Sequence, residues 1–295
     1  ILNSQPMGFY APAQLVRNAR EHGVEVRPVD VNRSQWESGL EEMQNEGEQD
    51  SSFCILHSDF CISLGFHMLE GMAEAHAARI VEARGDRPFR SLEDFTQRTG
   101  LGQAVITRLA KAGAFGTLGL DRRASLWHAL AQDQKELPLF AGHEANDEPE
   151  PALPPMSPAE EVLADYRTAG LSLSAHPLKF LRASLDSLGV AQAEQLKTWP
   201  NNRPVSVAGL VLVRQRPGTA KGITFVILED ETGQANLIIR PTVWQRFRKA
   251  AMGATVLLAH GQLQRHEQVI HVLVTRLENL SDRLKDLAPQ SRDFC

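Results

Sequence analysis

The sequence predicts an α+β protein of several domains, in which a mainly helical region precedes a five-stranded β-barrel. Residues 205–280 contain β-branched and apolar runs separated by turn residues, which is typical of short strands. Residues 64–119 contain two successive helix–turn–helix patterns with glycine at the turns. An acidic, proline-rich tract separates these regions, and 295 residues are enough for two or three domains.

The barrel is predicted within residues 201–280. A helix near Val243–Met252 should separate the third strand from the fourth. The five expected strands are Val205–Arg214, Ile223–Asp230, Gln234–Arg240, Thr255–Gln264 and Gln268–Leu280. This order is that of the OB fold, whose curved face and long first loop bind single-stranded nucleic acid or oligosaccharide.

The charge of the first barrel loop favours nucleic acid over sugar. Arg214, Arg216 and Lys221 flank a Pro-Gly-Thr-Ala turn, and Arg240 ends the third strand. We interpret these four cations as candidate contacts to phosphate groups. The alternative is an ordinary solvated surface. Residues 203–276 contain ten Lys or Arg against four Asp or Glu, which favours the first interpretation.

Residues 53–135 are predicted to form a tandem helix-hairpin-helix region. In the clearer second unit, helices Leu92–Arg98 and Ala104–Lys111 flank a Gly-Leu-Gly turn. Backbone N–H groups at such a turn can hold a DNA phosphate without reading bases. A helix C-cap followed directly by an N-cap is the alternative. The candidate DNA contacts in this hairpin are Gly100, Leu101, Gly102 and Gln103.

The first hairpin unit departs from this pattern. It comprises Met68–Glu74 and a predicted helix Ala75–Ala83. Ala73 occupies the place of the second glycine, and Glu70 adds a negative charge. We therefore expect this hairpin to bind phosphate weakly and to be mainly structural.

The composition argues against a membrane protein and against a protein held together by disulfides. The net charge of -5 is uneven, because residues 136–165 contain eight acidic and no basic side chains. Residues 136–158 are a predicted linker, 159–200 a helical connector and 281–295 a polar tail. The connector is expected to begin with a helix that has Ser157 as its N-cap and Pro158 at its first position. The three cysteines suit a reducing cytoplasm, and we expect no membrane partner, since no apolar run approaches about 18 residues.

Two sets of residues that could bind a metal or act in catalysis are interpreted as structural. Cys54, His57, Cys61 and His67 are metal-ligand types, but their intervals of three, four and six residues fit no standard zinc spacing. We predict no metal site there. His176 precedes a helix that starts with proline, and we expect it to be a structural hydrogen-bonding residue.

The sequence resembles bacterial C-family DNA polymerases, the family of the replicase α subunit. The resemblance begins with LNSQPMGFY at residues 2–10 and RPVDVN at residues 27–32, which are similar to the end of the fingers region. Residues 1–52 are therefore expected to be the end of that region in a longer polypeptide. The runs YRTAGLSLSAHP, VAGLVLVRQRPGTAKG and LEDETGQANL resemble the error-prone, translesion branch.

The resemblance implies a DNA-directed DNA polymerase acting in damage-induced mutagenesis and translesion synthesis. It implies Mg²⁺ bound by palm carboxylates outside this segment, so we assign no catalytic residue here and expect the segment alone to be inactive. The expected partners are primer-template and single-stranded DNA, with mutagenesis accessory proteins. A replicative α subunit, a non-catalytic adaptor built from hairpins and barrel, and a protein-binding OB domain are the alternatives.

A short peptide at the start of the linker resembles the motif by which bacterial polymerases bind the sliding clamp. An apolar peptide beside an acidic tract needs a partner surface to cover it. Packing against its own domain is the alternative. The candidate clamp-binding residues are Glu136, Leu137, Pro138, Leu139 and Phe140, with Glu136 in place of the usual Gln.

Overall fold

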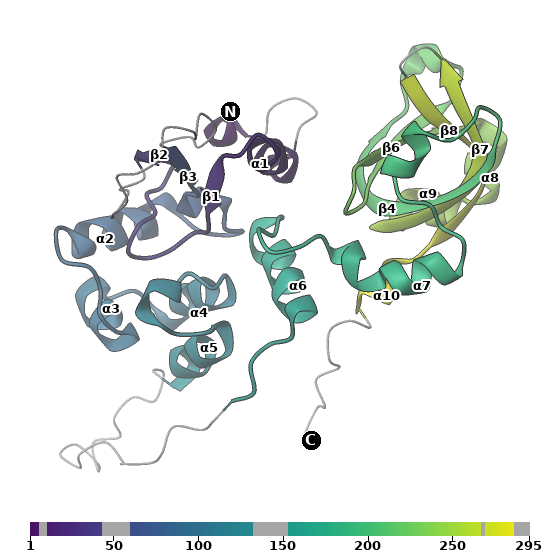
Figure 1. The fold of residues 1–295 in the computed structure, drawn as a ribbon. Helices are drawn as coiled ribbons and strands as arrows, with labels where there is room; N and C mark the ends of the chain where they lie inside the picture. Colours follow the sequence, from purple (N-terminus) through teal and green to yellow (C-terminus); the bar gives the residue numbers. More distant parts are fainter. Residues whose placement is uncertain (6–10, 43–59, 132–152, 267–268, 286–295) are drawn as a thin grey trace, which may run out of the picture. The chain divides into compact units, whose positions relative to one another are not determined.

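The structure is a computed structural model that describes residues 1–5, 11–42, 60–131, 153–266 and 269–285 (Figure 1). The chain divides into two compact units, Ile1–Leu173 and Ser174–Cys295, and each is considered by itself. None of the helices in the described ranges is long and apolar enough to cross a membrane.

The first unit begins with a small sheet. The strands are β1 (Glu25–Arg27), β2 (Gly39–Glu42) and β3 (Phe60–Ser63), in the order β1-β3-β2. β3 pairs in parallel with β1 and antiparallel with β2. β1 ends at Arg27, because Pro28 offers no N–H to a neighbouring strand.

The helices of the first unit confirm the tandem hairpins. Before the sheet come the 3₁₀ turn η1 (Leu2–Ser4) and α1 (Pro12–Glu21), and η2 (Phe66–Met68) and η3 (Gly116–Leu118) are further 3₁₀ turns. The α-helices are α2 (Glu74–Arg84), α3 (Leu92–Thr99), α4 (Gln103–Lys111), α5 (Arg122–Ala131) and α6 (Pro158–Ala169). As predicted, Pro158 starts α6, and the Ser157 hydroxyl accepts a hydrogen bond from the Glu160 N–H at 3.3 Å.

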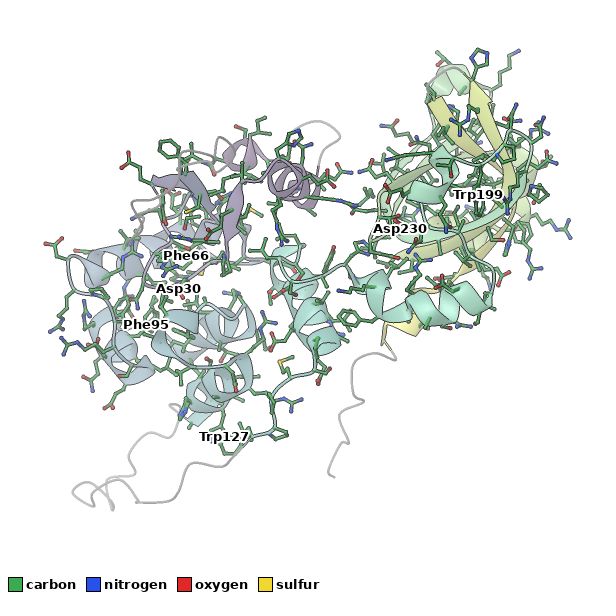
Figure 2. The ribbon with its side chains drawn as sticks, in the orientation of Figure 1. Asp30, Phe66, Phe95, Trp127, Trp199 and Asp230 are labelled. Atoms are coloured by element: carbon green, nitrogen blue, oxygen red, sulfur yellow. The ribbon has the colours of Figure 1, made fainter. Side chains whose placement is uncertain are left out.

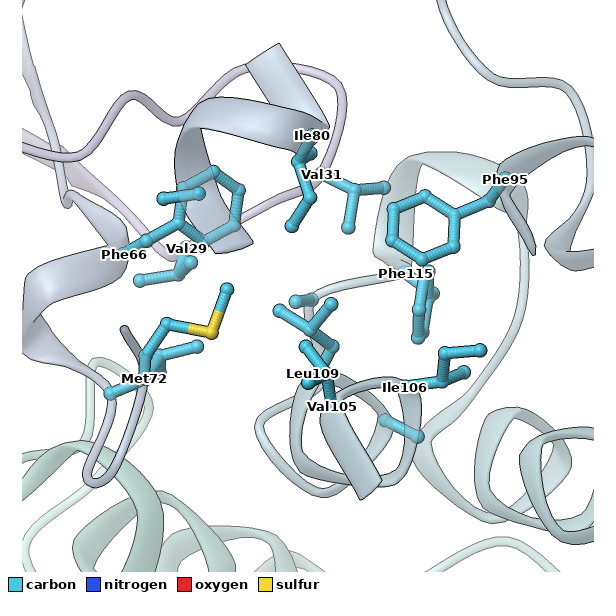
Figure 3. Close-up of a cluster of buried hydrophobic side chains, with 14 of the residues drawn as sticks. Val29, Val31, Phe66, Met72, Ile80, Phe95, Val105, Ile106, Leu109 and Phe115 are labelled. Atoms are coloured by element: carbon cyan, nitrogen blue, oxygen red, sulfur yellow. The ribbon is translucent and has the colours of Figure 1, made fainter. Parts of the chain in front are cut away.

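One hydrophobic core holds this unit together (Figure 3). Phe95 lies edge-on to Phe115, with their ring centroids 5.2 Å apart. Val29 and Val31 belong to the same cluster, although both precede the hairpin region in sequence. The described part of residues 1–52 therefore folds together with the hairpins and shares their core.

A buried carboxylate fastens the N-terminal segment to the hairpin region. Asp30 accepts hydrogen bonds from the Thr117 N–H at 3.0 Å and the Thr117 hydroxyl at 2.7 Å (Asp30 is labelled in Figure 2). Arg84 of α2 donates to the carbonyls of Val31 and Ser34, and burial lowers the pKa of Arg84. These bonds satisfy polar groups that would be costly to bury alone.

The second unit is a closed barrel, as the sequence predicts. The strands follow each other around it as β4-β5-β6-β8-β7, and β6 and β8 are parallel. The strands are β4 (Pro204–Gln215), β5 (Thr224–Glu229), β6 (Gln234–Ile239), β7 (Val256–His266) and β8 (Val269–Asn279). The helices α8 (Pro241–Arg246) and α9 (Arg248–Gly253) lie between β6 and β7 in the chain. The unit also contains η4 (Pro177–Leu181), α7 (Arg182–Ser187), η5 (Glu194–Lys197), η6 (Gly218–Ala220) and α10 (Ser281–Lys285).

Two predicted helices are divided in the structure. The helix expected at Val243–Met252 is interrupted at Phe247, whose ring packs against the barrel core. The helix expected at Pro177–Leu188 consists of η4 followed by α7. The predicted connector 159–200 is also shared between units, with α6 in the first and α7 in the second.

Glycine is required where barrel strands approach closely. A Cβ at Gly261 would lie 2.2 Å from the Leu273 carbonyl oxygen, beside the irregular register between β7 and β8. A Cβ at Gly209 would lie 2.7 Å from the Glu229 carbonyl oxygen. Both contacts are impossible for any side chain, so these glycines permit the barrel to close.

The turn after β5 is held by Asp230 and Glu231. Asp230 accepts hydrogen bonds from the Thr232 N–H at 2.7 Å and the Ala193 N–H at 2.7 Å (Asp230 is labelled in Figure 2). Burial would raise the pKa of Glu231, but hydrogen bonds from Arg182 outweigh it and lower that pKa. Residues 229–231 thus end a strand and form a turn.

Candidate nucleic-acid interface

The second hairpin presents two backbone N–H groups at the start of α4. Gly100 ends α3 in the left-handed conformation with φ 55°, and its N–H donates to the Thr96 carbonyl. The Leu101 N–H faces the Thr99 hydroxyl at 3.4 Å. The N–H groups of Gly102 and Gln103 form no hydrogen bond with the described part of the chain.

The space in front of this hairpin is open. Gly102 is the N-cap of α4, and no described atom lies within 4 Å of a Cβ built on it. Leu101 is buried in the core and anchors the turn. Of the four predicted hairpin contacts, the structure therefore leaves the N–H groups of Gly102 and Gln103 available to a phosphate, while those of Gly100 and Leu101 are used internally.

Arg214 has an internal partner that the sequence did not reveal. Its Nε donates to the Ala251 carbonyl at 2.8 Å, and an Nη donates to the Ala254 carbonyl. The guanidinium thus binds carbonyls at the C-terminal end of α9, where a cation is favourable. Burial lowers the pKa of Arg214, which nevertheless stays charged, as arginine does in proteins.

The other three predicted barrel cations are exposed at one end of the sheet. β5 starts at Thr224, which pairs with Ile239 at the end of β6, so the first loop lies next to Arg240. Lys221 adopts a left-handed conformation with φ 47° after η6. The side chains of Arg216, Lys221 and Arg240 form no hydrogen bond or ion pair with any residue that the structure describes.

An apolar strip on the outer barrel surface continues from this cationic end. Phe225 of β5 pairs with Ile238 of β6, which pairs with Leu273 of β8. These half-buried side chains alternate with inward-facing core residues such as Val226 and Leu237. We call Phe225, Ile227, Ile238 and Leu273 the outer strip.

A groove beside the outer strip adds polar groups. Asn236 and His271 pair directly across β6 and β8 and line a groove of about 340 Å³ together with Lys197. Sequence analysis missed both the strip and the groove. The alternation of apolar residues in TFVILE and QANLII is the signal that could have identified the strip.

Comparison with known proteins agrees with this geometry. Residues 23–125 match the helix-hairpin-helix motif family, and residues 205–280 match the family of OB-fold nucleic acid binding domains. The whole chain is 43% identical to "Error-prone DNA polymerase 1" of Rhizobium meliloti. It is 46% identical to the error-prone DNA polymerases of Rhodopirellula baltica and Anaeromyxobacter dehalogenans, again over 100% of its length.

The chain is homologous over its whole length to a C-terminal part of the error-prone DNA polymerases. It spans about a quarter of these relatives, 27% of the first and 25% of the other two. The resemblance inferred from residues 2–10 and 166–177 is therefore confirmed. This chain contains a helix-hairpin-helix region followed by an OB-fold domain.

The other predicted residues are the possible metal ligands, the clamp-binding candidates and His176. Cys54 and His57 lie outside the described residues, as do the clamp-binding candidates 136–140. Cys61 is buried in β3, and His67 Nδ1 lies 2.8 Å from the Trp36 carbonyl oxygen. His176 Nδ1 accepts a hydrogen bond from the Leu178 N–H at 3.2 Å, which confirms its structural role.

Proposed function

We propose that the chain is the DNA-binding portion of a cytoplasmic, DNA-directed DNA polymerase that carries out error-prone translesion synthesis in damage-induced mutagenesis. In this proposal the hairpin region holds the duplex of the primer-template, and the barrel holds single-stranded template. The observation that carries it is the cationic end of the barrel, where the side chains of Arg216, Lys221 and Arg240 have no partner among the described residues and adjoin the outer strip.

The arrangement suits binding without sequence preference. Cations at the end of the sheet would contact phosphates, and Phe225 would stack on a base. Both contacts are available to any base sequence, as a polymerase requires of its template. The Gly102 and Gln103 N–H groups would likewise contact duplex phosphate without reading a base.

The phosphoryl-transfer chemistry is proposed to belong to other parts of the polymerase. There, Mg²⁺ held by palm carboxylates would activate the primer hydroxyl. Within the described ranges no group of three or more His, Cys, Asp or Glu could hold a metal ion, and Asp30 and Asp230 bind backbone N–H groups instead. We expect the purified chain to incorporate no nucleotide in a primer-extension assay, and incorporation would contradict this division of roles.

Fluorescence anisotropy of labelled oligo(dT) over a salt series tests the barrel's role. The double variant Arg216→Ala/Lys221→Ala should lower the slope of log K against log salt by about 1.4, since each single-strand phosphate contact contributes about 0.7. The control Lys179→Ala/Arg276→Ala removes the same charge from exposed positions away from the first loop and should leave the slope unchanged. Equal slopes in both variants would contradict the proposal.

The outer strip also favours a second candidate, a protein-binding barrel. Its half-buried apolar side chains would suit a protein partner such as a mutagenesis accessory protein. Phe225→Ala separates the two. If the barrel binds DNA by stacking, this variant should weaken oligo(dT) binding by about 1–3 kcal/mol. Unchanged DNA binding would favour the protein partner, and the 136–140 peptide, proposed to bind the sliding clamp, would be the next site to test.

A further inference from the structure

The two hairpin units repeat the same local design. Gly71 and Gly100 both have positive φ, 71° and 55°. In each unit the second helix starts three residues after this glycine, α2 at Glu74 and α4 at Gln103. The sixth residue of α2 is Arg79, and the sixth residue of α4 is Arg108.

Each of these arginines faces the glycine of the other hairpin. A Cβ on Gly100 would lie 3.1 Å from an Nη of Arg79, and a Cβ on Gly71 would lie 3.2 Å from an Nη of Arg108. The arginine in the second helix of each unit therefore lies over the glycine turn of the other unit.

The two arginines differ in their bonding. Arg79 donates to the carbonyls of Thr99 at 2.6 Å and Gly100 at 3.2 Å. The Arg108 side chain is half-buried and forms no hydrogen bond or ion pair with the described part of the chain. The Nη and Nε donors of Arg108 are therefore available to an acceptor on a ligand.

Arg108 lines a groove of about 390 Å³ that also contains two exposed cations. Lys111 comes from the last turn of α4, and Arg167 comes from the last turn of α6. The Glu70 N–H donates to the Thr168 carbonyl at 2.8 Å, which ties α6 to the first hairpin. The groove is lined by Glu70, Gly71, Ala104, Thr107, Arg108, Lys111, Arg167 and Thr168.

The charge balance of this groove favours an anion. Three cations face one carboxylate, that of the exposed Glu70, and none of the three has a partner in the described residues. Like charges gathered without counter-ions repel each other, so a bound anion would stabilise the arrangement. The planar fork of Arg108 matches the geometry of phosphate oxygens, and the Thr107 hydroxyl can donate a further hydrogen bond.

We infer that this groove, between the first hairpin, α4 and α6, binds a phosphate group of the duplex DNA backbone. The inference rests on the proposed function for the identity of the DNA, but not for the existence of the anion site. It gives the first hairpin a role that its own sequence does not predict. The turn supplies Gly71, over which the guanidinium of Arg108 can lie, and the positive charge comes from α4 and α6.

The test measures blunt duplex DNA binding to the full chain by fluorescence anisotropy across a salt series. Arg108→Gln/Lys111→Gln should weaken binding about tenfold near 0.1 M salt and reduce the salt slope by about 1.8, since each duplex contact contributes about 0.9. The matched control Arg33→Gln/Arg90→Gln removes two exposed cations of the same unit whose side chains have no partner among the described residues, and it should change the slope little. Equal changes in the two variants would overturn the inference.

A second variant controls for misfolding of Arg108→Gln/Lys111→Gln. Lys111→Gln/Arg167→Gln replaces two exposed side chains, and it should give the same slope change with an unaltered melting temperature. A slope equal to that of the parent chain would overturn the assignment of these residues.

NMR titration of ¹⁵N-labelled chain distinguishes the source of the phosphate. The amide signals of Gly71 and Thr107 should shift with duplex at much lower concentration than with inorganic phosphate, and Arg108→Gln/Lys111→Gln should abolish the shifts. Shifts with inorganic phosphate alone would overturn the assignment to DNA. If the parent chain failed to bind any duplex, the duplex role of the hairpin region would fail, and the phosphate titration would still decide whether an anion site exists.

Discussion

The two hairpins share one backbone design and use it differently. In the second, the turn exposes the N–H groups of Gly102 and Gln103. Arg79 donates hydrogen bonds to the carbonyls of Thr99 and Gly100 in the same turn. In the first, Ala73 replaces the exposed glycine, and the Glu70 N–H is already bonded. The two copies of the motif therefore keep the same fold but offer different groups to a phosphate. The second copy offers backbone N–H groups, whereas the groove beside the first copy offers side chains of α4 and α6.

Removing each of the paired arginines should separate a structural role from a binding role. Arg79→Ala leaves the Thr99 and Gly100 carbonyls without their donor, and should lower the free energy of unfolding by about 2 kcal/mol. Arg108→Ala removes no side-chain hydrogen bond to the described residues and should lower it by less than about 0.5 kcal/mol. Urea denaturation followed by circular dichroism measures both, and equal losses would contradict the comparison.

Alanine at the two positive-φ glycines should show what the hairpins have in common. Gly71→Ala and Gly100→Ala should each destabilise the chain by about 1–2 kcal/mol, because both place a Cβ in a left-handed conformation. Gly119→Ala is the matched control, since it has φ 72° with no described atom within 4 Å of the Cβ. Thermal melts compare the three variants, and a neutral effect at Gly71 alone would show that the turns are not equivalent.

Exchanging the N-cap residues should sharpen the difference between the exposed turns. Gly102→Ala makes the second hairpin resemble the first, and should cost about 0.5 kcal/mol of stability. It should also weaken duplex binding about threefold, because the new Cβ would occupy the open space in front of the N–H groups.

The reverse exchange, Ala73→Gly, is its control. The exposed Glu70 carboxylate lies in this first turn and repels phosphate, so the added glycine should leave duplex affinity nearly unchanged. Improved binding in Ala73→Gly would show that the first turn contacts phosphate through its backbone.

The sequence predicted the architecture well, because local signals specify it. Strand alternation, turn residues and the Ser157 cap placed the barrel and α6 within a few residues of their observed bounds. Loop cations were predicted less completely. Arg214 looked equivalent to Arg216, but its partners, Ala251 and Ala254, are reached only after the barrel closes.

The groove beside the first hairpin was not predictable from sequence for the same reason. Arg108 is 37 residues from Gly71 along the chain, and Arg167 is 59 residues beyond Arg108. Nothing local indicates that they line one cavity. The equivalence of Arg79 and Arg108 could have been noticed by aligning the two hairpins, but only the structure shows that one is bonded and the other is not.

A crossed salt titration tests the division of DNA binding between the two units most directly. The parent chain, Arg108→Gln/Lys111→Gln and Arg216→Ala/Lys221→Ala would each be titrated against blunt duplex and against oligo(dT). We predict that the first variant lowers the salt slope for duplex alone, and that the second lowers it for oligo(dT) alone. If either variant changed both slopes equally, or neither slope, the assignment of duplex to the hairpin unit and single strand to the barrel would be contradicted.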